Sequence, residues 1–236
     1  MAIVLAAGKG SRMKSDTPKQ FLMLRGKPVL YYALKAFEDS FVDEIILVTG
    51  EGQQEYCRKN VVEKYGLTKV SSIIAGGKER YDSVYCGLQA VSQADYVYIH
   101  DGARPFVDAN ILDEAKRCVE QYSACAAGMP VKDTIKIVDN SQFVEHTPER
   151  KYLWMIQTPQ AFSYVLIKEA YARLKLEGCE VSITDDAMVV EYMMRRPVKL
   201  FPGSYENIKI TTPEDLPLAE RIIEKREKNK KNKICY

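Results

Sequence analysis

Several common sequence signatures are missing from this chain of 236 residues. Its six cysteines form no Cys-x-x-Cys pair and no cluster with histidine, which favours reduced thiols over disulfides or a zinc site. The net charge is only +2, which argues against a dedicated nucleic-acid-binding protein, because such proteins carry a strong basic excess. No apolar stretch approaches the ~20 residues that span a bilayer, and no charged-then-apolar leader precedes the first predicted strand. We therefore expect a cytoplasmic protein that binds neither nucleic acid nor membrane.

The most informative feature that is present is a glycine loop near the start of the chain. Residues 3–6 form a short apolar run that predicts a strand, residues 7–12 read AGKGSR, and residues 18–20 read PKQ. The spacing matches neither the Walker A loop nor the Gly-x-Gly-x-x-Gly loop of dinucleotide-binding proteins. Glycine has no Cβ, so its backbone N–H groups can approach a phosphate chain closely, while Arg12 can fork onto phosphate oxygens and Lys19 can act as a point charge. The segment predicts a phosphate site and resembles the signature of nucleotidyltransferases that activate sugar-like phosphates.

Strand and helix patterns alternate along most of the chain, which favours an α/β fold with a mainly parallel sheet and helices on both faces. Strands are predicted at residues 3–6, 44–49, 70–75, 96–100, 124–130, 198–202 and 207–211. Helices are predicted from residue 28 onward and at 53–65, 83–91, 110–122, 164–176 and 185–194, with a last helix beginning at Thr212-Pro213-Glu214-Asp215. We expect one domain over residues 1–224, because 46% hydrophobic residues can supply a sizeable core. Residues 225–236 are mostly Lys, Arg, Glu and Asn, which predicts a basic, flexible tail.

The alternation breaks at residues 131–154. Residues 131–138 alternate in part between apolar and polar side chains, a turn cluster follows at 139–142, and a weaker strand-like run comes next. This pattern predicts a β-hairpin arm that projects from the α/β body. The apolar alternation suggests that one face of the arm is covered, and a second subunit would supply that cover. The sequence therefore predicts a homodimer formed through the arm.

Four further segments carry residues suited to a functional site. They read GGKERYDSV at residues 76–84, HDGARP at 100–105, Arg150 followed by TPQ at 158–160, and Gly203 followed by NIKITTPEDL at 207–216. The second of them ends the fourth predicted strand, and ligands of open α/β sheets bind outside the carboxyl ends of strands. Together with the glycine loop, and in the same order, they resemble the 2-C-methyl-D-erythritol 4-phosphate cytidylyltransferase family over about residues 2–224. This resemblance implies a Rossmann-like nucleotidyltransferase fold.

The related ribitol-5-phosphate cytidylyltransferase family shares the TPQ and NIK-x-T segments. Two segments favour the methylerythritol family, namely Thr134 within VKDTIK and the TDDA run at 184–187, where the ribitol enzymes carry a different stretch. One departure is a glycine at position 102, where the family usually has alanine. The glycine removes no functional group. A third alternative, from a different class, is a regulatory nucleotide-binding module without catalysis. The presence of Arg12, Lys19 and Lys209 counts against it.

The resemblance also implies a role for individual residues. Those that would bind CTP are Ala6, Ala7, Gly8, Gly77, Ser83 and Asp101. Those that would hold the triphosphate and act in catalysis are Arg12, Lys19 and Lys209, together with Mg²⁺, for which Asp101 is the candidate ligand. Those that would surround the methylerythritol phosphate are Arg104, Thr134, Arg150, Thr184 and Asp185.

The expected reaction makes sense of these residue types. A phosphate monoester would attack the α-phosphorus of CTP in line, and pyrophosphate would leave. The attacking group is already an anion, so the site needs no strong general base. It needs positive charge, which brings two anions together and stabilises the transition state. Lysines and arginines on several loops, with a divalent ion, meet that need.

Overall fold

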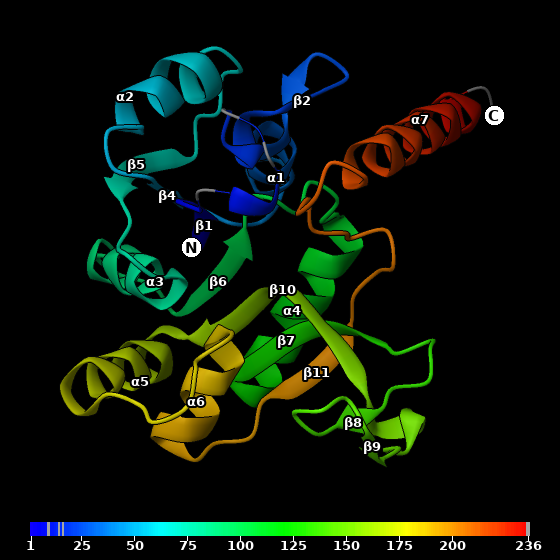
Figure 1. Cartoon of the computed structure of the whole chain (residues 1–236). Helices are drawn as coiled ribbons and strands as arrows, with labels where there is room; N and C mark the ends of the chain where they lie inside the picture. Colours follow the sequence, from blue (N-terminus) through cyan, green and yellow to red (C-terminus); the bar gives the residue numbers. More distant parts are fainter. Residues whose placement is uncertain (9, 14, 16, 235–236) are drawn as a thin grey trace.

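The computed structural model describes residues 1–8, 10–13, 15 and 17–234, so Lys9 of the glycine loop and the last two residues of the chain lie outside the described residues. A central sheet of seven strands has the order β11-β7-β10-β6-β1-β4-β5. The strands are β1 (Ala2–Ala6), β4 (Ile45–Thr49), β5 (Val70–Ala75), β6 (Tyr96–Asp101), β7 (Ala124–Pro130), β10 (Trp154–Ser163) and β11 (Lys199–Pro202). All pairings are parallel except those of β10, which runs antiparallel to β6 and β7 (Figure 1). The predicted α/β fold with a mainly parallel sheet is confirmed.

Helices cover both faces of this sheet, as the sequence predicts. The helices are α1 (Val29–Glu38), α2 (Gln54–Cys57), which continues as a π-helical segment (Arg58–Glu63), α3 (Arg80–Gln89), α4 (Ala109–Tyr122), α5 (Tyr164–Glu177), α6 (Asp186–Met194) and α7 (Asp215–Ile234). In β1, Ala2, Val4 and Ala6 pack with α1 and α4 on one face. Ile3 and Leu5 pack with α3, α5 and α6 on the other. A strand buried on both faces must be apolar throughout, which explains the continuous apolar run that identified β1.

Side-chain caps fix where several helices begin. Asp108 accepts a hydrogen bond from the Ile111 N–H at the start of α4. Glu79 and Asp82 form a reciprocal capping box, so α3 begins at Arg80, three residues before the predicted start at Ser83. This earlier start brings Arg80 to the first turn of the helix, directly after the glycine turn.

The carboxyl-terminal region differs from the prediction in two respects. Residues 207–211 are not a strand, although the Ile210 N–H donates to the Ala103 carbonyl. The Asp215 carboxylate accepts hydrogen bonds from the N–H groups of Thr211 and Thr212, so the turn at 212–214 precedes α7 instead of forming its first residues. The predicted boundary at residue 224 lies within α7, which continues to Ile234. None of the helices in the described part of the chain is long and apolar enough to cross a membrane.

The arm at residues 131–154 is a hairpin, as predicted, but its strands are short. Strand β8 (Ile137–Val138) pairs antiparallel with β9 (Val144–His146), and the short 3-10 helix Arg150–Tyr152 leads back to β10. The arm projects away from the sheet (Figure 1). Phe143 and Tyr152 are 74% and 72% exposed, which is unusual for large apolar side chains. A second small hairpin, β2 (Met23–Leu24) with β3 (Lys27–Pro28), leads into α1, and further 3-10 turns lie at Ser11–Met13 and Lys19–Phe21.

Candidate active site

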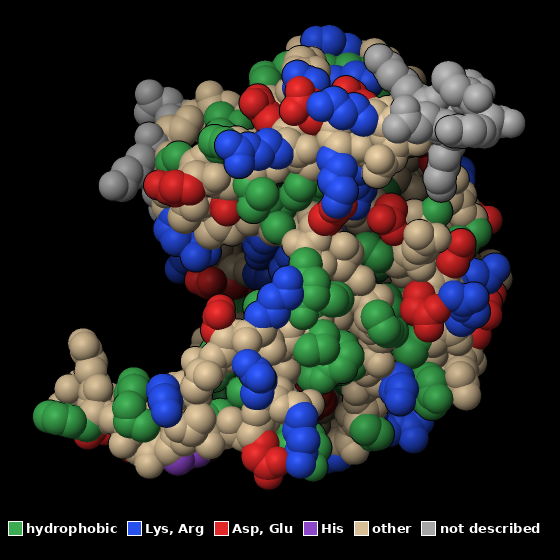
Figure 2. Space-filling model, turned by 90° about the vertical axis from the view of Figure 1, so that its right-hand side faces the viewer, with side chains coloured by type: hydrophobic (Ala, Val, Ile, Leu, Met, Phe, Trp, Pro, Cys, Tyr) green, Lys and Arg blue, Asp and Glu red, His purple; other side chains and the backbone are tan. Residues whose placement is uncertain are grey.

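A cleft of about 1070 Å³ opens at the carboxyl ends of β1, β4, β5 and β6. This is the edge of an open α/β sheet at which ligands bind. Figure 2 shows the molecule hollowed above the projecting arm, with acidic and basic side chains inside the hollow. Eight of the residues predicted for the site line the cleft, namely Ala6, Ala7, Gly8, Lys19, Gly77, Ser83, Asp101 and Lys209. The structure thus brings together residues that are more than 200 positions apart in the sequence, such as Ala6 and Lys209.

Two glycine-containing loops meet at one end of this cleft. A Cβ added at Gly76 would lie 2.8 Å from the Ala7 Cβ and 2.5 Å from the Ser83 Oγ, so only glycine allows the loop after β5 to lie so close to the loop after β1. The Ser83 Oγ accepts a hydrogen bond of 3.2 Å from the Gly77 N–H. The buried Gln20 side chain donates to the Ala6 carbonyl at 2.7 Å. These contacts fix the positions of the two loops at this end of the cleft.

Asp101 is the charged centre of the cleft. Its Oδ2 lies 2.7 Å from the Lys209 Nζ, and its Oδ1 lies 3.3 Å from the Arg80 Nε. Burial alone would raise the pKa of Asp101, but the positive charges of Arg80 and Lys209 outweigh it and hold the pKa well below its ordinary value. Asp101 is therefore ionised across the physiological pH range and keeps Lys209 at the cleft.

Lys19 lies in a strongly positive part of the cleft. The pKa of Lys19 is lowered to about 8, mainly by burial and also by the nearby ammonium of Lys209 and guanidinium of Arg12, against the opposing effect of Asp101. A Cβ added at Gly10 would lie 3.2 Å from the Lys19 Cγ, so the glycine loop packs directly on this lysine. Cations held together at a cost in solvation form a preorganised site for a polyanion.

Residues of β10 hold the end of β6, where Asp101 lies, through hydrogen bonds. The Thr158 Oγ accepts a hydrogen bond of 3.0 Å from the Asp101 N–H and lies 3.1 Å from the His100 Nδ1. The Asn207 side chain donates to the Thr158 carbonyl at 2.9 Å. Burial lowers the pKa of His100 to about 4, so the imidazole is neutral and acts as a structural link between Thr158 and the Arg104 carbonyl. The TPQ and NIK segments singled out from the sequence thus meet beneath Asp101.

Two predicted cations lie beside the cleft without lining it. Arg104 is largely buried, its Nη1 donates to the Asn207 carbonyl at 2.8 Å, and its Nε has no hydrogen-bond partner within the described part of the chain. Burial lowers the pKa of Arg104, although the Asp101 carboxylate opposes this effect. Arg12 is exposed and close enough to affect the pKa of Lys19.

Four residues that were predicted to surround the second substrate do not reach the cleft of their own chain and contact other parts of the protein. Asp185 caps α6 by accepting from the Met188 N–H at 2.9 Å, and it accepts from the Gln160 side chain at the same distance. The Thr184 Oγ contacts the Met188 sulfur at 3.6 Å. Thr134 and Arg150 are exposed on the arm, where Arg150 donates to the Lys132 carbonyl at 3.0 Å. None of the four lines the cleft of its own chain, and their roles stay predictions.

The sequence reasoning missed Arg80, although it singled out the segment that contains it. Arg80 forks onto Asp186 with distances of 2.9 and 2.8 Å, and the Tyr171 hydroxyl donates to the same carboxylate at 2.6 Å. Its Nε contacts Asp101, so Arg80 links the cleft to α6. A basic residue at the start of a helix after a glycine turn was an available signal. Its acidic partner, 106 positions away, was not.

Comparison with known proteins identifies the family. The profile of the 2-C-methyl-D-erythritol 4-phosphate cytidylyltransferase family matches residues 1–225. The chain belongs to this family. It is 54% identical to a cytidylyltransferase of that name from Lachnospira eligens over 219 residues, which cover 92% of this chain and 96% of that one. It is 50% identical to the corresponding protein of Clostridium botulinum strain Langeland over 225 residues, with 94% and 96% of the two chains covered.

Solved structures of this cytidylyltransferase family share the fold. The 4-diphosphocytidyl-2C-methyl-D-erythritol synthase of Anaerococcus prevotii superposes with a TM-score of 0.81 at 34% identity, covering 94% of this chain and 95% of that one. The cytidylyltransferase of Thermus thermophilus superposes with a TM-score of 0.76 at 30% identity, covering 94% and 98%. The predicted Rossmann-like nucleotidyltransferase fold and the predicted family are both confirmed.

Proposed function

We infer that this cytidylyltransferase transfers CMP from CTP to 2-C-methyl-D-erythritol 4-phosphate and releases pyrophosphate. The product would be 4-diphosphocytidyl-2-C-methyl-D-erythritol, an intermediate of the non-mevalonate isoprenoid pathway. One observation carries the inference: in a chain of this family, Lys19 and Lys209 converge on one cleft with the glycine loop and the ionised Asp101. The relatives compared above bear the methylerythritol name, so the ribitol-phosphate alternative is not favoured. Membership of an enzyme family likewise counts against a non-catalytic regulator.

The end of the cleft at which the two glycine-containing loops meet suits the base of CTP. The loops that carry Ala7, Gly76 and Ser83 approach closely, and we expect the space beside them to hold a single ring in preference to the two fused rings of a purine. Backbone groups of Ala6, Ala7, Gly8 and Gly77 can read the edge of the base, and Asp101 lies within the same cleft to face the ribose. The triphosphate would then extend toward Lys19 and Arg12, where positive charge is concentrated.

The chemical step needs no general base from the protein. A phosphate oxygen of the methylerythritol phosphate forms a bond to the α-phosphorus of CTP, the bond from that phosphorus to the bridging oxygen of the β-phosphate breaks, and the electron pair leaves with pyrophosphate. Lys19 and Lys209 offset the negative charge that accumulates on the non-bridging oxygens in the transition state. Arg104, whose guanidinium is close enough to Asp101 to lower the pKa of that carboxyl, would bind the phosphate of the second substrate.

A divalent ion is part of the proposal, and the donor groups of the cleft fit it. Mg²⁺ is usually bound through one or two carboxylates together with substrate phosphates. Asp101 supplies one ionised carboxylate, and no group of three acidic, cysteine or histidine side chains converges within the described residues. This donor set suits an ion that arrives with the triphosphate. Bound there, Mg²⁺ would neutralise the charge of the phosphates. Asp101 would hold the ion and also position the Lys209 ammonium.

We also propose a homodimer in the cytoplasm, with the arm completing the site of the partner. The arm exposes Ile137, Val138, Phe143, Val144 and Tyr152 together, and an isolated hairpin of this kind is marginally stable by itself. Thr134 and Arg150 are on this arm and outside the cleft of their own chain, which supports a role in the other chain. The five free cysteines among the described residues support a reducing compartment.

A pyrophosphate-release assay tests the proposed function. The enzyme is incubated with Mg²⁺, with CTP, ATP or GTP, and with methylerythritol phosphate, ribitol 5-phosphate or no polyol. We expect rapid release only with CTP and methylerythritol phosphate. Faster release with ribitol 5-phosphate would show that ribitol 5-phosphate, and not methylerythritol phosphate, is the substrate. Equal turnover with ATP would refute the one-ring pocket. No release with any pair would refute catalysis.

A further inference from the structure

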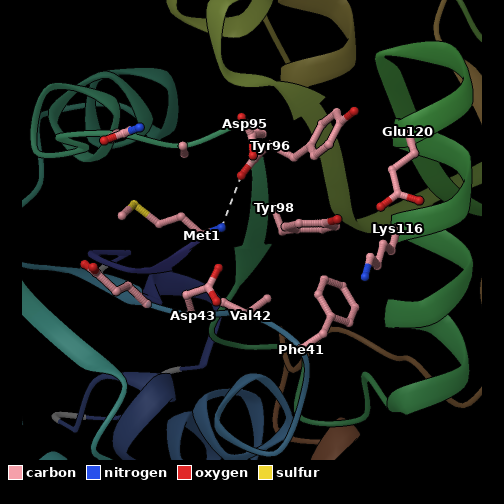
Figure 3. Close-up of a pocket in the computed structure, with 12 residues that line it drawn as sticks. Met1, Phe41, Val42, Asp43, Asp95, Tyr96, Tyr98, Lys116 and Glu120 are labelled. Carbon is pink, nitrogen blue, oxygen red and sulfur yellow. Dashed lines mark hydrogen bonds between the residues drawn. The ribbon is translucent and has the colours of Figure 1, made fainter.

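A second cavity, of about 460 Å³, lies at the opposite end of the sheet from the active-site cleft. It is bounded by the amino-terminal ends of β1 and β6, by the segment that leads into β4, and by α4 (Figure 3). The active-site cleft lies at the carboxyl ends of the same strands, so the two cavities do not share a wall residue. We call this second cavity the acidic pocket and define it by Phe41, Asp43, Asp95, Tyr98 and Glu120.

Negative charge predominates in the acidic pocket. Four carboxylates line it, those of Asp43, Glu44, Asp95 and Glu120, against the ammonium groups of Met1 and Lys116. Burial lowers the pKa of the Met1 ammonium, while Asp43, Glu44 and Asp95 all oppose this effect, so the three carboxylates interact with the same cation. That ammonium donates to the Tyr96 carbonyl at 3.1 Å (Figure 3). The charge balance favours a cationic ligand, in contrast to the basic active-site cleft.

The carboxylates are too far apart for a bare metal ion. No three acidic, cysteine or histidine side chains in the described part of the chain converge on a common point. Asp43 and Asp95 lie near Met1 on one side of the pocket, and Glu120 lies across it on α4 (Figure 3). A ligand whose positive charges are spaced along a chain can reach both sides, whereas a compact ion reaches only one.

The floor of the pocket carries an unused polar group. Tyr98 is only 3% exposed, lines the pocket, and its hydroxyl makes no hydrogen bond with the described residues. Burial raises the pKa of Tyr98, and Glu120 adds to this effect, so the hydroxyl stays protonated and lies near Glu120 (Figure 3). A protonated hydroxyl that lines the pocket can accept a hydrogen bond from a ligand amine.

The aromatic wall of the pocket already accommodates an ammonium group. The rings of Phe41 and Tyr98 pack edge to face, with centroids 5.5 Å apart and planes at 68°. The Lys116 Nζ lies 4.9 Å from the centre of the Phe41 ring. This geometry is that of a cation–π contact. The wall would pack equally well against the methylene groups of an alkylamine.

We propose that the acidic pocket binds a linear polyamine. One amino group would lie between Asp43 and Asp95, the alkyl chain would cross the rings of Phe41 and Tyr98, and a second amino group would reach Glu120 and the Tyr98 hydroxyl. The cavity volume of about 460 Å³ falls within the range of small-molecule sites. The site is independent of the reaction proposed for the cleft.

Isothermal titration calorimetry with spermidine tests the proposal on the full chain without nucleotide. The buffer contains about 150 mM salt, because this screens weak surface attraction. We expect saturable one-to-one binding in the wild type. The double variant Asp95→Asn/Glu120→Gln should bind about tenfold more weakly or worse, and Tyr98→Phe about threefold more weakly. Asp113→Asn, which removes an exposed carboxylate of α4 outside the pocket, should bind like the wild type.

The outcomes separate cleanly. If no saturable binding is seen up to about 10 mM spermidine, the affinity is negligible and the proposal is overturned. So does a double variant that loses less than about tenfold, or an Asp113→Asn variant that loses as much, because the binding would then be diffuse. Circular dichroism establishes that each variant is folded, and if the double variant is not, the comparison of Tyr98→Phe with the wild type decides. Pyrophosphate release is measured separately, so failure of one proposal does not affect the other.

Discussion

The guanidinium of Arg80 forks onto the carboxylate of Asp186 with distances of 2.9 and 2.8 Å. The Asp186 side chain is fully buried, and that of Arg80 is 27% exposed. Because the Nε of Arg80 also contacts Asp101, this pair ties the cleft to helix α6, which begins immediately after Thr184 and Asp185. The two proposed substrate subsites are thereby joined by one side chain.

Replacement of Arg80 should destabilise the fold. Arg80→Met removes the charge and leaves the buried Asp186 with only the Tyr171 hydroxyl, so we expect a loss of about 3 kcal/mol in the free energy of unfolding. Urea denaturation measures the loss. Arg117→Met, at an exposed pair with Glu114, is the matched control and should change stability by less than about 0.5 kcal/mol. Equal effects of the two substitutions would show that the buried pair has no special role.

Lys19 and Lys209 should matter for turnover more than for binding. Lys19→Ala and Lys209→Ala should each lower kcat by ~10² or more, as expected when one donor that stabilises a transition state is lost. The KM for CTP should change less. Steady-state kinetics at saturating CTP measures both, with Lys228→Ala on the exposed face of α7 as the control. Near-normal kcat in either variant would remove that lysine from the catalytic group.

The pKa of Lys19 predicts proton uptake when CTP binds. With a pKa of about 8, a large fraction of Lys19 is neutral at pH 8 in the free protein, and a triphosphate favours the charged form. Binding should therefore take up protons near pH 8, and affinity should fall as the pH rises above 8. Below about pH 7 Lys19 is already protonated and contributes no uptake.

Calorimetry in two buffers of different ionisation enthalpy, with EDTA present, measures this uptake. Lys19→Arg keeps the charge throughout the range, so it should bind CTP without uptake from this position and with a weaker dependence on pH. The same uptake in the wild type and in Lys19→Arg would mean that another group titrates.

A substitution at Gly8 distinguishes an effect on protein stability from an effect on CTP binding. A Cβ at this position would meet no protein atom within 4 Å, so Gly8→Ala should leave the melting temperature unchanged. If the triphosphate approaches the backbone there, the added methyl group should weaken CTP binding about tenfold. Thermal unfolding and a CTP titration give the two quantities. Unchanged affinity in a stable variant would place the nucleotide away from Gly8.

The arm predicts a shared active site in the proposed dimer. Lys19→Ala and Arg150→Ala proteins, each inactive alone, are mixed under conditions that allow subunits to exchange. If Arg150 acts in the partner's site, each mixed dimer contains one site with both defects and one with none. Random exchange makes about half of the dimers mixed, so roughly a quarter of wild-type activity should return. Proven exchange without recovery would confine Arg150 to its own chain.

Much of the site could be predicted because parallel strands end at the same edge of the sheet. The motifs after β1, β5 and β6 each follow an apolar run, so their meeting follows from the alternation of strands and helices. The strand β10 could not be predicted in this way. It contains Pro159 and the buried polar residues Gln157 and Gln160, whose partners Asn207 and Asp185 are distant in sequence.

The opposite error occurred at residues 207–211. Their alternation resembles a strand, but the Asn207 side chain donates to β10 and the Ile210 N–H to the Ala103 carbonyl, so the segment follows the cleft as an irregular loop. Such tertiary hydrogen bonds outweigh local propensity. The same loop brings Lys209 to Asp101. The strand pattern in the sequence does not predict this contact.

The most direct test of the account is ³¹P NMR of the reaction of wild-type enzyme with CTP and methylerythritol phosphate. The account predicts that the monoester signal disappears while a pyrophosphate signal and a pair of coupled diphosphate signals grow in equal amounts, at a rate at least ~10² times that of Lys19→Ala. Release of inorganic phosphate instead of pyrophosphate, or an unchanged monoester while CTP is consumed, would contradict transfer of CMP to this substrate.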